Sequence, residues 1–377
     1  MDSLQKINIL GQAAQYDLCG SYQCTCPPRA RGPFGRWIYP AVMPDGKTIL
    51  LLKVLMSNFC ENDCYYCFNR YSRDFQRISF QPEELAKLFM DLYYRRQVQG
   101  LFLSSAVCGS VNRTMEQMIK TAELLRLKYK FRGYIHLKIL PGASFDYVLR
   151  ATQLADRVSV NLEAPNPERL AKLTTKKELV RDILTPMKWI HGLQQQEEHQ
   201  RLSQTTQFVV GAAGESDQEI LRTTDWLYRK LGLTRAYYSA FQPVKDTPLE
   251  NHPATPLMRE HRLYQTDFLF RRYGFRLEEI SFDDQGNLPI DKDPKLVWAL
   301  KHPERFPVEI NQAAKEDLMR VPGIGPITAN RIIKNRLKNK FSDLTELKGL
   351  GVVVKRAAPF ILIKGKVQHQ GLQLAIF

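Results

Sequence analysis

The chain has 377 residues, of which 44% are hydrophobic and 25% charged, and these values exclude collagen-like, low-complexity and disulfide-framework proteins. Its length exceeds the roughly 250 to 300 residues at which a single hydrophobic core stops growing, so we expect more than one domain. The apolar runs are far shorter than the roughly 18 residues of a membrane span, and no secretion signal is visible at the start. We therefore expect a cytoplasmic protein without a membrane partner. The formal net charge of +15 favours a polyanionic partner.

In chain order, a loop-rich extension over residues 1–45 comes first, and short apolar strands then alternate with helical segments. One helix is expected to begin at Pro82, and another after Ser216, which has Glu219 at capping-box spacing. The strands are expected at 48–54, 100–103, 134–140, 157–162, 206–210 and 235–240. Six such units predict the α/β class, with a partial parallel (β/α)6 barrel over residues 46–305. The last part, residues 306–377, is expected to be an all-α domain.

Three cysteines follow the first predicted strand in a C-x3-C-x2-C pattern, namely Cys60, Cys64 and Cys67. Thiolates this close in sequence can hold one metal centre, and soft sulfur ligands favour an iron-sulfur cluster or zinc. A structural zinc ion normally takes four ligands, whereas three cysteines leave one iron of a four-iron cluster open to another ligand. The position also fits, because active sites of parallel barrels lie at the carboxyl ends of the strands. A zinc loop, or three cysteines packed in the core, is the alternative.

This triplet, with Tyr66 before its last cysteine, resembles the signature of the radical S-adenosylmethionine (SAM) superfamily. The resemblance implies a [4Fe-4S] cluster on Cys60, Cys64 and Cys67 that binds SAM and cleaves it to a 5′-deoxyadenosyl radical. It also implies an electron donor such as flavodoxin or ferredoxin. Two serines stand where the superfamily places a Gly-Gly-Glu-like turn. The implied cofactor-binding residues are Tyr66, Ser104, Ser105, Asn161, Glu163 and Gly211. No catalytic acid, base or hydrogen donor is singled out.

Four further cysteines have no place in this triplet. Cys19, Cys24 and Cys26 lie in the N-terminal extension, and Cys108 follows the second predicted strand. Such a group could bind a second cluster or a zinc ion, or the thiols could be small core residues.

The segment 318–333 is typical of two helices joined by a tight Gly-x-Gly hairpin at Gly323 and Gly325, and a weaker copy follows at Gly349 and Gly351. The glycines expose backbone N–H groups at a helix start, where an anion such as a DNA phosphate is favoured. Residues 308–366 carry twelve Lys and Arg against five Asp and Glu, a net charge of +7 in 59 residues. The pattern is similar to a tandem helix-hairpin-helix module. The expected phosphate contacts are Gly323, Gly325, Thr328, Arg331, Lys334, Gly349 and Gly351.

Together, these features resemble the radical SAM proteins with a C-terminal helix-hairpin-helix region that are linked to DNA modification or repair. The resemblance implies an enzyme that acts on a base or sugar of DNA. Two alternatives remain from the sequence: an RNA-modifying radical SAM enzyme, and a non-catalytic DNA-binding protein whose cluster is structural or redox-sensing. The hairpins could also dock another protein, in which case their basic residues are surface charges that keep the chain soluble.

Overall fold

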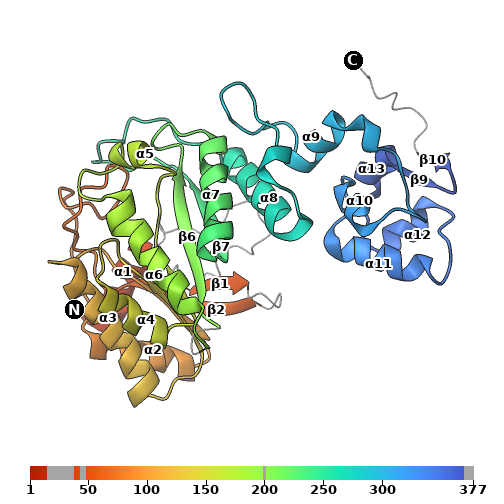
Figure 1. Ribbon diagram of the computed structural model, residues 1–377. Coiled ribbons are helices and arrows are strands. Elements are labelled where there is room, and N and C mark those ends of the chain that lie inside the picture. Colours follow the sequence, from red (N-terminus) through yellow and green to blue (C-terminus); the bar gives the residue numbers. More distant parts are fainter. Residues whose placement is uncertain (15–37, 43–47, 198–200, 369–377) are drawn as a thin grey trace. The chain divides into compact units, whose positions relative to one another are not determined.

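The computed structural model describes residues 1–14, 38–42, 48–197 and 201–368 (Figure 1). Within these residues the main element is a seven-stranded sheet in which each strand lies beside the next one in the chain. The first pair of strands is antiparallel, and the other pairs are parallel. The strands are β1 (Ile38–Val42), β2 (Thr48–Leu55), β3 (Gly100–Ser104), β4 (Tyr134–Lys138), β5 (Arg157–Ser159), β6 (Ser203–Val210) and β7 (Arg235–Ala240). The six parallel strands confirm the expected partial barrel, and β1 adds an edge strand within the predicted extension.

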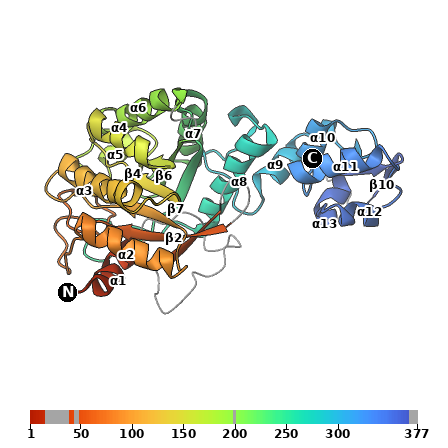
Figure 2. The same cartoon turned by 90° about the horizontal axis from the view of Figure 1, so that it is seen from below.

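Helices cover one face of this sheet (Figures 1 and 2). They are α2 (Pro82–Tyr94), α3 (Val111–Glu123), α4 (Phe145–Leu154), α6 (Thr185–Gln194) and α7 (Asp217–Leu231), with the shorter α5 (Pro167–Ala171) after β5 and α1 (Ser3–Ala13) at the start. Strand alternation explains the arrangement, because successive side chains point to opposite faces. Leu52 and Val54 are fully buried on the apolar face, while their neighbour Lys53 lies over the ring of Phe102 on the other face. The polar face therefore remains for a site.

The sequence signals for helix ends act as expected. Ser216 caps α7, and its side chain accepts a 3.2 Å hydrogen bond from the backbone N–H of Glu219. The Glu219 carboxylate in turn accepts one from the N–H of Ser216 at 2.8 Å, which completes the capping box. Gly232, with φ of +56°, ends this helix in the left-handed conformation that glycine adopts without strain. Pro82 is the first residue of α2, as the sequence predicts.

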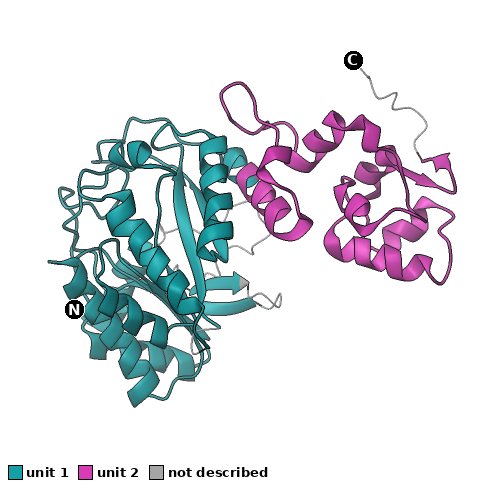
Figure 3. Cartoon of the chain, viewed as in Figure 1, with its two compact units in different colours: residues 1–261 teal, residues 262–377 magenta. Residues whose placement is uncertain are grey.

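The chain divides into two compact units, residues 1–261 and 262–377, with the division inside α8 (Leu257–Tyr273) (Figure 3). The boundaries expected near residues 45 and 305 fall within these units, so the three-part division stays a prediction. In the part of the chain that is described, no helix has the length and apolar character needed to cross a bilayer.

Unit 2 carries the two helical hairpins. Its helices are α9 (Pro294–Lys301), α10 (Lys315–Arg320), α11 (Pro326–Arg336), α12 (Leu344–Gly349) and α13 (Val354–Ala357). Leu318, Ile332 and Leu347 are fully buried between them. The region expected to be all-helical also has a small sheet in the order β10-β9-β8, formed by β8 (Val308–Glu309), β9 (Ile361–Ile363) and β10 (Lys366–Val367). This sheet joins the two ends of the hairpin region, because β8 pairs with β9.

Candidate functional site

The three clustered cysteines lie on residues 57–79, between β2 and α2, which we call the cysteine loop. Its two ends are joined at the base, where Ser57 and Ser79 form a β-bridge and their hydroxyls lie 2.7 Å apart. Asn58 strengthens this closure: its side-chain amide donates to Gln76 O at 3.0 Å and accepts from Ile78 N at 2.7 Å. The loop is therefore a closed surface loop that holds its own shape.

Cys60, Cys64 and Cys67 line one pocket together with Tyr66. Two of the sulfurs accept backbone hydrogen bonds at 3.4 Å, Cys60 Sγ from the N–H of Asn62 and Cys67 Sγ from that of Asn69. Burial raises the pKa of the Cys64 and Cys67 thiols. A metal centre would have to offset that cost, and N–H donors to sulfur stabilise thiolate ligands and tune the potential of a cluster.

The sulfur arrangement distinguishes two kinds of centre. Among the described residues, no group of three His, Cys, Asp or Glu side chains is placed to hold a single metal ion. A four-iron cluster binds each cysteine through a different iron atom, so its three sulfurs need not converge on one point. Three sulfurs on one pocket wall, two of them with N–H donors, and no fourth protein ligand among the described residues fit a cluster with an open iron better than a structural zinc ion.

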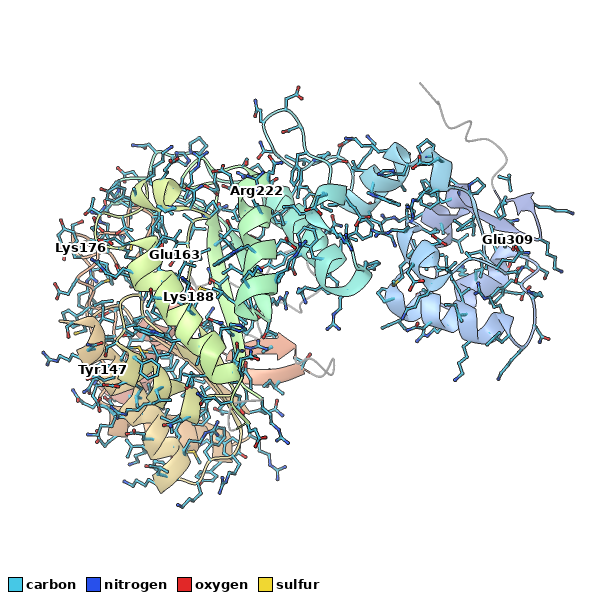
Figure 4. The ribbon with its side chains drawn as sticks, viewed as in Figure 1. Tyr147, Glu163, Lys176, Lys188, Arg222 and Glu309 are labelled. Atoms are coloured by element: carbon cyan, nitrogen blue, oxygen red, sulfur yellow. The ribbon has the colours of Figure 1, made fainter. Side chains whose placement is uncertain are left out.

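The sequence-predicted cofactor residues at the ends of β3 and β5 also line this pocket, namely Ser104, Ser105, Asn161 and Glu163. The Asn161 amide donates to Glu163 Oε1 at 3.2 Å. Glu163, labelled in Figure 4, is buried and has φ of +66°, which is unusual for a residue with a side chain. Hydrogen bonds to β6 hold it there, since its N–H donates to Gln207 O and its carbonyl accepts from Val209 N, each at 2.9 Å. Such maintained backbone strain is typical of functional sites.

Gly211 is not among the residues that line the pocket. It follows β6 with φ of +89°, and a Cβ there would lie 2.1 Å from Thr255 Oγ1. Its N–H and that of Ala213 donate to the Glu215 carboxylate, which closes a tight turn. The structure thus gives Gly211 a turn-forming role, and its expected contact with the cofactor stays a prediction.

Several polar residues in the pocket wall were missed by the sequence analysis, among them Lys138, Lys177, Gln207 and Ser239. Lys138, Gln207 and Ser239 lie on β4, β6 and β7, where the alternation of side chains along a strand could have predicted which of them face the pocket. Lys177 stands in a loop after α5 and matches no motif. Burial lowers its pKa, but the thiolate of Cys64 and the carboxylate of Glu163 outweigh this effect and raise it overall, so the side chain is cationic.

The first hairpin of unit 2 has the geometry that its glycines predict. Gly323 has φ of +87°, and a Cβ there would lie 2.7 Å from Val353 O. Its own carbonyl accepts from Val353 N at 3.0 Å, so the turn packs directly on the second hairpin. Gly325 is the N-cap of α11.

The second hairpin turns at Gly351, which has φ of +92°, whereas Gly349 is the last residue of α12. Two side chains of α11 contact this turn: Thr328 Oγ1 donates to Gly351 O at 3.4 Å, and Arg331 donates to Leu350 O at 3.2 Å. Thr328 and Arg331 therefore brace the second hairpin. Lys334 is exposed on α11.

Of the four cysteines outside the triplet, Cys108 alone lies within the described residues, and it does not line the pocket. Cys19, Cys24 and Cys26 lie outside the described residues. Cys108 is half-buried, and its backbone N–H donates to Thr114 Oγ1 at 2.9 Å. A second cluster or zinc ion stays a prediction.

Residues 54–227 match the family model of the radical SAM superfamily, and residues 305–359 match that of the helix-hairpin-helix motif. A comparison with curated proteins finds no match. Among solved structures, similar chains include HydG, a maturase of the [FeFe]-hydrogenase, with 14% identity and a TM-score of 0.45 over 57% of this chain and 48% of that one. Methylornithine synthase (PylB) has 12% identity and a TM-score of 0.47 over 57% of this chain and 60% of that one.

This chain thus spans about half of HydG and three-fifths of PylB, and the likeness to both is distant. The superfamily implies a [4Fe-4S] cluster and SAM, and the matched segment includes the cysteine loop and the pocket residues from Ser104 to Gln207. Residues 54–227 therefore carry a radical SAM domain, which supports an enzyme of unspecified reaction, and residues 305–359 carry a helix-hairpin-helix motif.

Proposed function

We propose that this chain is a radical SAM enzyme that modifies or repairs a base or sugar of DNA. The observation that carries the proposal is the presence, in one chain, of a cysteine-lined pocket and a helix-hairpin-helix motif within a basic region, since residues 308–366 carry a net charge of +7. The pocket supplies the radical chemistry. The motif supplies affinity for the phosphate backbone, and such contacts do not depend on the base sequence.

In the pocket, Cys60, Cys64 and Cys67 are the proposed cluster ligands. When bound, the cluster supplies the electron that splits SAM, and an electron donor of the flavodoxin or ferredoxin type would restore it. The carboxylate of Glu163 and the amide of Asn161 can accept from the ammonium or the ribose hydroxyls of SAM, and the Lys177 ammonium can pair with its carboxylate. Ser104 Oγ adds a further donor at the end of β3. A target nucleotide must leave the base stack, or already be single-stranded, for its reacting atom to enter this pocket.

On unit 2, part of the positive charge is used within the fold. Arg320 forms a 2.9 Å ion pair with Glu279, and Arg356 is paired with Asp293. Lysines on and beside the hairpin helices are exposed instead, among them Lys334, Lys338, Lys348 and Lys355. These side chains can neutralise phosphates without reading sequence, which is how backbone-gripping modules bind.

The radical chemistry is tested by anaerobic reconstitution with iron, sulfide, SAM and a reductant. We expect 5′-deoxyadenosine from the native chain and none from Cys64→Ala, while Cys108→Ala, outside the pocket, retains cleavage. Native protein that holds an intact cluster but releases no 5′-deoxyadenosine would favour the non-catalytic adaptor instead.

The nucleic-acid partner is tested by binding at fixed salt, with duplex DNA, single-stranded DNA and tRNA in competition. If the motif contacts about four phosphates, DNA affinity falls on the order of 10²-fold between about 50 and 200 mM salt. A preference for tRNA would favour the RNA-modifying alternative. Binding that is insensitive to salt would remove the DNA proposal.

A further inference from the structure

The guanidinium of Arg77 occupies the inside of the cysteine loop. Its Nη1 donates to the carbonyls of Asn58 at 2.5 Å and Asn69 at 2.9 Å. Its Nη2 donates to those of Arg70 at 2.6 Å and Arg73 at 3.1 Å. One side chain thus binds four backbone acceptors of the loop, of which only the carbonyl of Arg70 also accepts from a backbone N–H, that of Arg73 at 3.3 Å, among the described residues.

Two of these four carbonyls flank the cysteine segment. Asn58 stands two residues before Cys60, and Asn69 stands two residues after Cys67. By bonding both carbonyls through one nitrogen, Arg77 connects the two ends of the cysteine segment and sets the distance between them. Only a planar guanidinium offers this fixed fork of donors, because a lysine ammonium is a single point with three rotatable donors.

Aromatic rings of the same loop fix the orientation of the guanidinium. It lies 3.9 Å from the ring centroid of Phe75, and that ring is in turn 4.8 Å from the ring of Phe68. Arg73 covers the other side of this pair, 4.4 Å from the Phe68 ring. The loop therefore has a small core of its own, built from an arginine and two phenylalanines.

Arg77 also places a positive charge beside the cysteines. Within the described residues, its hydrogen bonds go to carbonyl oxygens and none to a carboxylate. It donates to the carbonyl of Asn69, whose own N–H donates to Cys67 Sγ, so the cation lies beside the cysteine segment. Burial lowers the pKa of Arg77, and the thiolates of Cys60 and Cys67 oppose this effect. A nearby cation favours the reduced, more negative state of a cluster, so it raises the reduction potential.

We propose that Arg77 is a positioning residue that holds the cysteine loop in its cluster-binding form before any cluster is assembled, and that its charge raises the potential of the bound cluster. This inference rests on the proposed function, because it requires Cys60, Cys64 and Cys67 to be the cluster ligands. It adds a role outside the cysteine motif, at a residue that contacts neither the cluster sulfurs nor SAM through its hydrogen bonds.

The experiment compares Arg77→Ala, Arg77→Lys and the control Arg73→Ala. Arg73 is an arginine of the same loop that also lies over its aromatic rings, but its guanidinium donates to one loop carbonyl, that of Phe68, and to Lys245 O outside the loop. It therefore controls for the loss of a charge and of ring contacts in the loop. The first readout is iron bound per chain against free iron and sulfide during reconstitution. The second is limited proteolysis of the cysteine loop in the cluster-free protein. The third is the midpoint potential of whatever cluster forms, and circular dichroism checks that each variant is folded.

We expect Arg77→Ala to weaken cluster binding about 10- to 100-fold, as supporting residues of metal ligands do, and to expose the cluster-free loop to protease. Arg77→Lys should lose cluster affinity as well, yet keep the native potential, while the clusters formed in Arg77→Ala shift to a more negative potential. Arg73→Ala should load a cluster like the native chain.

Two failures are distinguishable. If the native chain binds a cluster through the three cysteines and Arg77→Ala binds it equally well with the same potential, the role of Arg77 is refuted and the proposed function stands. If the native chain binds no cluster, or Cys64→Ala still binds one, the ligand assignment fails, and the Arg77 inference fails with it.

Discussion

The carboxylate of Asp63 accepts a 2.5 Å hydrogen bond from the hydroxyl of Thr174, 111 residues further along the chain. Its second oxygen accepts from the N–H of Thr175 at 3.0 Å and from its hydroxyl at 2.6 Å. Asp63 lies between Cys60 and Cys64, and the segment it binds leads directly to Lys177 in the pocket wall. The contact thus fixes the cysteine loop against the segment that supplies the pocket cation. Lys176 of that segment, labelled in Figure 4, also donates to Glu61 O of the loop at 2.5 Å.

Removing this contact should loosen the pocket. Asp63→Ala leaves the Thr174 hydroxyl and the Thr175 N–H without their acceptor, so we expect a loss of about 1 to 3 kcal/mol in the free energy of unfolding and weaker SAM binding. Chemical denaturation and SAM titration measure the two effects. Asp74→Asn is the matched control, because Asp74 is an exposed acid of the same loop. Equal behaviour of the two variants would contradict the account.

A pH dependence is expected from Glu260, a buried residue of α8. Its Oε2 accepts from the N–H of Ala240 at 2.8 Å, while its Oε1 has no hydrogen-bond partner. Burial raises the pKa of this carboxyl to about 7 from 4.5. A raised pKa means that its contribution to stability is full below about pH 4.5 and is lost as the pH rises through about 7.

Glu260→Gln removes that ionisation but keeps the size of the side chain. The native chain should therefore lose about 3 kcal/mol relative to Glu260→Gln between about pH 4.5 and about pH 8, measured as the difference in unfolding free energy. A difference that stays constant over this range would show that Glu260 does not titrate there.

Gly323 and Gly349 should respond differently to alanine. At Gly323, φ is +87° and a Cβ would meet Val353 O at 2.7 Å, so Gly323→Ala should cost about 1 to 3 kcal/mol and weaken DNA binding. Gly349 has no atom within 4 Å of an added Cβ and ends a helix, so Gly349→Ala should be neutral or stabilise by up to about 1 kcal/mol. Thermal unfolding and DNA titration of both variants test this contrast. Equal losses at the two positions would contradict the turn geometry described here.

The sequence predicted the barrel strands well because their apolar runs are buried and end at polar or turn residues. The strand expected at 235–240 matches β7 at both ends, and the others differ by a few residues at their termini. β1 was missed because an edge strand within a loop-rich stretch has no distinct hydrophobic pattern. The spacing of Cys60, Cys64 and Cys67 was enough to predict that they lie together, because they fall within eight residues of one loop.

Residues brought to the pocket by tertiary contacts could not be found in this way. The segment that carries Lys177 is held against the cysteine loop by contacts across more than 100 residues, among them those of Asp63 with Thr174 and Thr175. The second hairpin shows a different limit. Its Gly349-x-Gly351 spacing suggests a copy of Gly323-x-Gly325. In the structure, however, Gly349 belongs to α12, and the N-cap of the following helix α13 is Val353 and not a glycine.

Metal and sulfide analysis of the chain, purified without oxygen and reconstituted, tests the central claim most directly. The account predicts about four iron atoms and four acid-labile sulfides per chain, both lost in Cys64→Ala. Zinc bound by the three cysteines, with no sulfide present, would contradict it.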